Sequence, residues 1–249
     1  MPCSTLVQRC NTSPGDRTQS FPVSGGLLEN LDCSRDVLLR LVRPAVGEQA
    51  FSYIVSTVKV DRRNRYRQTG SAPNFQGDCL TLCTCKHQMR SRIGADDWPG
   101  KWIIGLSSRK NDNRHWLIYL ARVRSAYESH SELWIALPQR VRQAKSSRHF
   151  RLGDLHEPRR VLNGPARFDP NNYHDPIAGH VHADKWDIDV DYALKERKRQ
   201  PTQKPLAPLL VADSRLTFLW QEPILHFSQD HIRDYLKWQT LTAFLENVR

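Results

Sequence analysis

Two stretches of sequence decide the fold, KWIIGL at residues 101–106 and HWLIYLARV at residues 115–123. Both are rich in β-branched and aromatic residues, which pack well on the pleated surface of a sheet. Pro99 and Gly100 precede the first stretch, and a polar segment at 107–114 separates it from the second. This pattern predicts two strands joined as a hairpin.

Further elements are expected on both sides of this hairpin. The sequence FSYIVSTVKV at 51–60 predicts an earlier strand, and LLVA at 209–212 predicts a late one. Helices are expected at residues 27–42, 80–93 and 127–137, and from Ser228 to Leu245. This order of elements predicts an α+β domain. Its mixed or antiparallel sheet, or small barrel, would have flanking helices and a C-terminal helix.

The chain is expected to divide near residue 50. Residues 1–50 have the turn and linker chemistry of a tail followed by one helix, and residues 51–249 would form the main domain. No window approaches the roughly 18 apolar residues of a membrane-spanning helix. The first residues lack the basic and apolar regions of a secretory signal. We therefore expect a cytosolic, cytoplasmic protein without a membrane partner.

The charge of the chain is strongly localised. The sequence contains 37 Lys and Arg residues against 26 Asp and Glu residues, which gives a net charge of +11. The whole excess falls between residues 51 and 150, and much of it is arginine. A local positive field attracts polyanions, and the guanidinium fork suits phosphate. The charge predicts binding to DNA or to a nucleotide, and the alternative is a solvated basic surface.

A histidine-rich segment supports a different class of function, a metal-dependent hydrolase. In the sequence HVHAD at 180–184, an extended backbone would point His180 and His182 to one side, where Asp184 could join them around one ion. The further ligands of such an enzyme should follow downstream, where little chain remains. Glycine-rich phosphate loops and the usual nucleophile and deaminase signatures are absent. We assign no metal ligand and no cofactor from the sequence and keep the hydrolase as an alternative.

Short motifs follow one another in order between residues 53 and 174. They are YIVS at 53–56, APNFQG at 72–77, TLCTCKHQMR at 81–90, GKWIIG at 100–105, LIYLARV at 117–123, GD at 153–154 and NYH at 172–174. Together they resemble the second type of nucleotide modification associated domain. His87 stands where that family usually has proline, and Lys101 replaces an acidic residue.

The resemblance implies a link to systems that make or handle modified bases in DNA, often in conflicts between phages and bacteria. Other base-modification enzymes would then be possible partners. The two strand motifs are also similar to those of small PUA-like barrels, the pseudouridine-synthase-associated type, which read modified bases. A fold does not fix a function, so an enzyme and a non-catalytic reader of modified bases both stay open.

Candidate binding residues lie in the motifs and in the basic segment. We expect Tyr53 or Trp102 to stack on a base and Asn74 to contact a base edge. Lys86 and Arg90 are four residues apart, so on a helix they would share a face and clamp one phosphate. Further nucleic-acid contacts are expected from Arg62, Arg65 and Arg122.

Candidate reacting residues are fewer. If the protein is an enzyme, the polar groups expected to take part in catalysis are Cys85, Asp154 and His174. A pocket that holds one of these groups would favour the enzyme, and an aromatic pocket without a titratable group would favour the reader.

Overall fold

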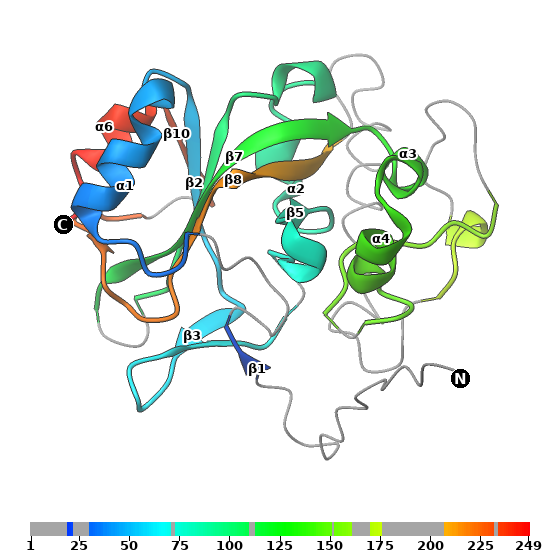
Figure 1. The fold of residues 1–249 in the computed structure, drawn as a ribbon, viewed down its shortest axis with the longest axis horizontal. Helices are drawn as coiled ribbons and strands as arrows, with labels where there is room; N and C mark the ends of the chain where they lie inside the picture. Colours follow the sequence, from blue (N-terminus) through cyan, green and yellow to red (C-terminus); the bar gives the residue numbers. More distant parts are fainter. Residues whose placement is uncertain are drawn as a thin grey trace, which may run out of the picture.

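A mixed sheet forms the centre of the protein. The computed structural model describes residues 19–21, 30–70, 73–109, 113–150, 152–160, 170–175, 207–231 and 234–249. In this part of the chain a seven-stranded sheet curls into a half-barrel, and a few short helices lie around it (Figure 1). The prediction of an α+β domain with a mixed sheet is confirmed.

The strands of the sheet come from distant parts of the sequence. They are β2 (Ala50–Ile54), β5 (Thr81–Leu82), β6 (Trp102–Leu106), β7 (His115–Tyr127), β8 (Leu209–Leu219), β9 (His226–Phe227) and β10 (Tyr235–Trp238). Their order is β10–β2–β6–β7–β8–β5, and β9 pairs with β7 beside this path. The pair β2–β6 is parallel, and the other described pairs of this sheet are antiparallel. A separate small sheet has the order β1–β4–β3, from Gln19–Ser20, Tyr66–Gln68 and Val58–Val60.

The predicted central hairpin is confirmed as β6 and β7. The pairing is antiparallel and begins with Trp102 opposite Arg122. Every residue of β6 is buried, which explains its uninterrupted apolar sequence. Gly105 is required by packing, because a Cβ at this position would lie 2.2 Å from the ring of Tyr119. The last glycine of the GKWIIG motif therefore lets the Tyr119 ring lie across the strand.

Five described helices surround the sheet. They are α1 (Arg35–Val42), α2 (His87–Arg90), α3 (His130–Ala136), α4 (Gln139–Lys145) and α6 (Leu241–Leu245). Ser34, Ser129 and Thr240 cap α1, α3 and α6, since each side-chain oxygen accepts a bond from a backbone N–H of the first turn. Figure 1 shows α1 and α6 beside β10, whereas α3 and α4 lie beyond the far ends of β7 and β8.

Three of the predicted elements are shorter or divided. The strand expected at 51–60 is β2 and β3, which a turn at 56–57 separates. The helix expected at 27–42 begins, within the described residues, at Arg35. The helix expected at 80–93 is wrong for its first half, which forms β5 and a bend before the four-residue α2. β5 pairs with β8, and this pairing overrides the weak local helical pattern.

The long C-terminal helix is also wrong. The described residues of this segment form β10 and the short helix α6. β10 pairs residue by residue with β2, from Tyr235 opposite Tyr53 to Trp238 opposite Ala50. A partner strand far away in the sequence therefore decides this conformation. Among the described helices, none is long and apolar enough to cross a membrane.

Candidate functional site

The APNFQG and GD motifs meet in a buried polar network. The backbones of Asn74 and Thr81 exchange two hydrogen bonds, with N···O distances of 3.1 and 2.8 Å. The Asn74 amide donates to the carbonyl of Leu152 at 2.8 Å, and Asn74 is only 2% exposed. Gly77 of the same motif has φ +73° and a Cβ there would lie 3.1 Å from Val141. The motif thus folds a loop tightly against β5 and α4.

Asp154 lies at the centre of this network. Its carboxylate accepts from the Thr81 hydroxyl at 3.0 Å and from the Cys83 N–H at 3.1 Å, and it is fully buried. Burial raises the pKa of Asp154 to about 6, and the nearby Lys145 ammonium opposes the rise. Lys145 is also buried and donates to the carbonyl of Cys79 at 2.6 Å. In this structure protein atoms enclose the carboxylate that the sequence offers as a reacting group.

The buried side chain of Arg90 anchors the helix α2 to neighbouring segments of the chain. Its Nε donates to the Cys85 carbonyl at 2.7 Å, and its Nη1 donates to the carbonyls of Ala207 and Pro208 at 2.9 and 2.7 Å. The indole N–H of Trp98 donates to the Arg90 carbonyl at 3.0 Å. Arg90 is 2% exposed, and its described contacts connect α2 to the residues just before β8 and to the loop that contains Trp98.

The Lys86 side chain lies between the buried Tyr53 and the exposed Asp234. Its ammonium lies 5.4 Å from the centroid of the Tyr53 ring and 2.7 Å from Oδ1 of Asp234. Tyr53 is buried, and its hydroxyl accepts a 2.5 Å hydrogen bond from the hydroxyl of Tyr119. Burial raises the pKa of both phenols, and the neighbouring Cys85 adds to this effect. Tyr53 therefore supports Lys86 from inside the protein.

An open groove lies between α2 and β10. It has a volume of about 390 Å³ and is called the α2–β10 groove below. Its lining residues are Gln88, Arg92, Asp234, Tyr235, Leu236 and Lys237. The Arg92 guanidinium lies over the Tyr235 ring, 5.5 Å from the centroid. Because Tyr235 stands opposite Tyr53 in the sheet, two neighbouring tyrosines each carry a cation from the α2 segment.

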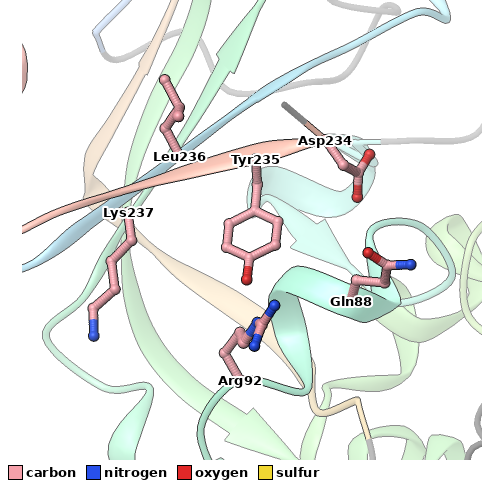
Figure 2. A pocket seen from close by; sticks show the side chains of 6 residues that line it. All are labelled: Gln88, Arg92, Asp234, Tyr235, Leu236 and Lys237. Atoms are coloured by element: carbon pink, nitrogen blue, oxygen red, sulfur yellow. The ribbon is translucent and has the colours of Figure 1, made fainter. Parts of the chain in front are cut away.

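The groove has two chemically different ends. Figure 2 shows Asp234 and Gln88 on one side of the Tyr235 ring and Lys237 on the other, with Arg92 near the hydroxyl end of the ring. Leu236 points to the opposite face of β10, as expected from the alternation of a strand. A carboxylate and an amide thus face one end of an aromatic platform, and cations face the middle and the other end.

The remaining candidate residues lie apart from this groove or within the core. Trp102 is completely buried and donates its indole N–H to the Ala45 carbonyl. Arg122 forms two bonds to the carboxylate of Glu48, and Arg62 is exposed on the turn between β3 and β4. His174 is half-buried after the 3₁₀ turn Pro170–Asn172, and its N–H donates to the Glu157 carbonyl.

The fold brings acidic residues onto the basic segment. Among the residues that the structure describes, five cations of this segment form ion pairs with carboxylates from outside residues 51–150. These pairs are Arg122–Glu48, Arg148–Glu157, Arg65–Glu222, Arg109–Asp230 and Lys86–Asp234. The excess positive charge of the segment is therefore partly balanced at the surface, which the sequence alone did not indicate.

The sequence does not indicate most of the groove. The helix predicted up to Leu245 contains Asp234, Tyr235 and Lys237, and a helix there does not place them on a strand beside α2. The alternation of Tyr235 and Lys237 was the available signal, because residues two apart share one face of a strand. Gln88 lies between the predicted clamp residues Lys86 and Arg90, and Arg92 follows them, but nothing in their residue types singles them out.

The hydrolase alternative is outside what the structure tests. His180, His182 and Asp184 lie outside the described residues. Within the residues that are described, no three His, Cys, Asp or Glu side chains are grouped so that they could hold a metal ion.

Comparisons with known proteins give one family. The search of curated proteins and the search of solved structures each found no match. The family model described as nucleotide modification associated domain 2 matches residues 48–160, which include β2, α2, β6, β7 and Asp154. Residues 48–160 thus match the model of a family that is described as associated with nucleotide modification, in agreement with the resemblance of the sequence motifs.

Proposed function

We propose that the protein binds a nucleotide, or a base of DNA, in the α2–β10 groove as part of base modification. The observation that carries this proposal is the Tyr235–Arg92 pair between an end with a carboxylate and an amide and an end with Lys237. Bases stack on aromatic rings and on guanidinium planes, and ammonium and guanidinium groups bind phosphate. A nucleotide has three parts that match these groups in order: a base edge for the carboxylate and the amide, a flat ring for Tyr235 and Arg92, and a phosphate for Lys237.

The size of the groove supports a single nucleotide unit. Its volume of about 390 Å³ lies within the range of about 300–1,000 Å³ that is common for small-molecule sites. Because the groove is open, it can take either a free nucleotide or a base that has left the stack of a DNA strand. A base in duplex DNA could not reach Tyr235 without such extrusion.

Recognition is better supported than catalysis. Asp154 is enclosed, and Cys85 is half-buried and close enough to the buried Tyr53–Tyr119 pair to affect the pKa of both phenols. His174 makes its described backbone bond to Glu157, a residue that is not part of the groove lining. Binding therefore requires only groups that line the groove, whereas a reaction at Asp154 requires a route into the interior, and the partly exposed Cys85 is not among the lining residues.

A pair of variants tests the site of binding. Arg92→Ala and Arg62→Ala each remove one exposed guanidinium from the basic segment. Binding of deoxynucleoside 5′-monophosphates to the full chain would be measured by calorimetry. We expect Arg92→Ala to weaken binding about tenfold, as for a lost charge-assisted contact, and Arg62→Ala to leave it nearly unchanged. The opposite result would move the site to the β3–β4 turn and contradict the groove.

Nucleoside mass spectrometry separates the enzyme from the reader. DNA would be compared from cells with the gene, without it, and with Lys86→Gln. A reader leaves the nucleoside profile unchanged while the full chain still binds the modified base. A nucleoside that appears or disappears with the gene would show chemistry, and the proposal of recognition alone would then be wrong.

A further inference from the structure

The carboxylate end of the groove restricts which base edge can face it. The Asp234 side chain is 51% exposed and accepts an ion pair from Lys86 at 2.7 Å. An ionised carboxylate can only accept hydrogen bonds. A base edge that faces Asp234 must therefore present an N–H donor, and a carbonyl oxygen at the same place would be repelled.

Gln88 adds the complementary group. Its side chain is exposed and lies on the same side of the Tyr235 ring as Asp234 (Figure 2). An amide offers both a donor and an acceptor. A carboxylate next to an amide can therefore match a donor and an acceptor that are neighbours on one base edge.

Cytosine and adenine carry such an edge, since each has an exocyclic amino group beside a ring-nitrogen acceptor, and the amino group of guanine lies between N1–H and the acceptor N3. Thymine and uracil have a ring N–H at N3, but a carbonyl oxygen flanks it on each side, so a carboxylate that accepts from N3–H also faces a carbonyl oxygen, which repels it. We infer that the α2–β10 groove selects nucleotides whose base carries an exocyclic amino group and discriminates against thymine and uracil, with Asp234 as the specificity-determining residue. This inference rests on the proposed function of the groove.

Lys86 affects this selection through its ion pair with Asp234. Its ammonium is held between the Tyr53 ring and Asp234, so it neutralises part of the carboxylate charge without entering the base-edge position. Removal of Asp234 would also release Lys86, which adds attraction for any phosphate. The ratio of the affinities for two nucleotides is therefore the informative quantity. A stronger attraction for phosphate changes both affinities equally and cancels in the ratio.

The test compares dCMP with dUMP, which share sugar and phosphate and differ in the base edge. Calorimetry with the full chain should give dUMP an affinity about fivefold to tenfold weaker, the lower range for a base contact because Asp234 is half-exposed. Asp234→Asn supplies an amide donor in place of the carboxylate and should bring the ratio close to one. Lys86→Gln is the matched control: it breaks the same ion pair, keeps the carboxylate and should keep the preference.

Each outcome separates the two proposals. If wild-type protein binds dCMP and dUMP equally, or prefers dUMP, the selection is wrong although the groove still binds nucleotides. If Asp234→Asn keeps the wild-type preference, Asp234 does not determine it. If neither nucleotide binds, the proposed function of the groove is wrong, and the inference falls with it.

Discussion

Replacement of Asp154 by asparagine tests whether burial or the neighbouring Lys145 controls the central polar network. The carboxylate is fully buried and accepts from Thr81 and Cys83. Burial favours the neutral acid, and the ammonium of Lys145 favours the carboxylate. Asparagine has nearly the same shape and keeps an oxygen for the Cys83 N–H, but it does not titrate. The variant therefore separates the charge of Asp154 from its hydrogen bonds.

The expected magnitude follows from the shift in pKa. The pKa of Asp154 rises from 3.8 to about 6 in the folded protein. Between these values the folded state holds a proton at Asp154 that the unfolded state has lost. The contribution of this group to the free energy of unfolding consequently falls as the pH rises through this window. A shift of about two units corresponds to about 3 kcal/mol.

Urea denaturation followed by tryptophan fluorescence measures this effect. The free energy of unfolding of Asp154→Asn, relative to wild type, should rise by about 3 kcal/mol between pH 4 and pH 7. Equal slopes against urea for both proteins would show that the unfolded states are comparable. Asp96→Asn is the matched control, because Asp96 is exposed, and its difference from wild type should stay nearly constant.

The opposite trend would refute the reasoning. If the relative stability of Asp154→Asn falls from pH 4 to pH 7, Lys145 stabilises the carboxylate more than burial destabilises it. A flat difference would mean that the two effects cancel. Asp154→Ala should be worse than Asp154→Asn at every pH, by about 2–4 kcal/mol, because it leaves the Cys83 N–H without its acceptor.

Gly105, His130 and the Arg65–Glu222 pair give three more predictions of stability. Gly105→Ala should lower the free energy of unfolding by about 2–3 kcal/mol through overlap with Tyr119, and an unchanged melting temperature would contradict the packing. Burial lowers the pKa of His130 to about 3, so the unfolded state alone gains its proton below pH 6.5. Wild type should then lose about 3 kcal/mol more than His130→Gln between pH 7 and pH 4, and parallel pH profiles would argue against a neutral His130. Arg65→Ala should cost less than about 1 kcal/mol in urea denaturation, since its ion pair is exposed, and a larger loss would show an additional role.

The sequence predicted the elements whose conformation is set locally. β6 and β7 are adjacent in the chain, and their apolar and aromatic residues match the faces they bury. The segment at 228–245 differs from the predicted helix for a physical reason. Its apolar residues suit either a helix or a strand, and pairing with β2, far away in the sequence, decides the outcome. The parallel contact between β2 and β6 is likewise set by the tertiary fold.

The motifs predicted the family but not the arrangement of the site. Asn74, Arg90 and Asp154 have side chains that could bind a ligand, and the same donors and acceptors can bind the protein itself. The structure places all three in buried contacts with backbone groups, among them Leu152 and Cys83. A single sequence gives residue types without their surroundings, so it could not distinguish these two uses.

The groove and its supports come from different parts of the chain. Residues 48–160 supply α2, which Arg90 anchors, and the buried network around Asp154. β10, which lies beyond that range, supplies the ring of Tyr235, the cation of Lys237 and, just before it, the carboxylate of Asp234. Asp234 and Lys237 are exposed at one edge of the sheet, so they can change without disturbing the core, whereas Tyr235 is half-buried and packs against it. If the groove binds a base as proposed, its selectivity therefore depends on exposed residues at and just before β10, outside the range that the family model matches.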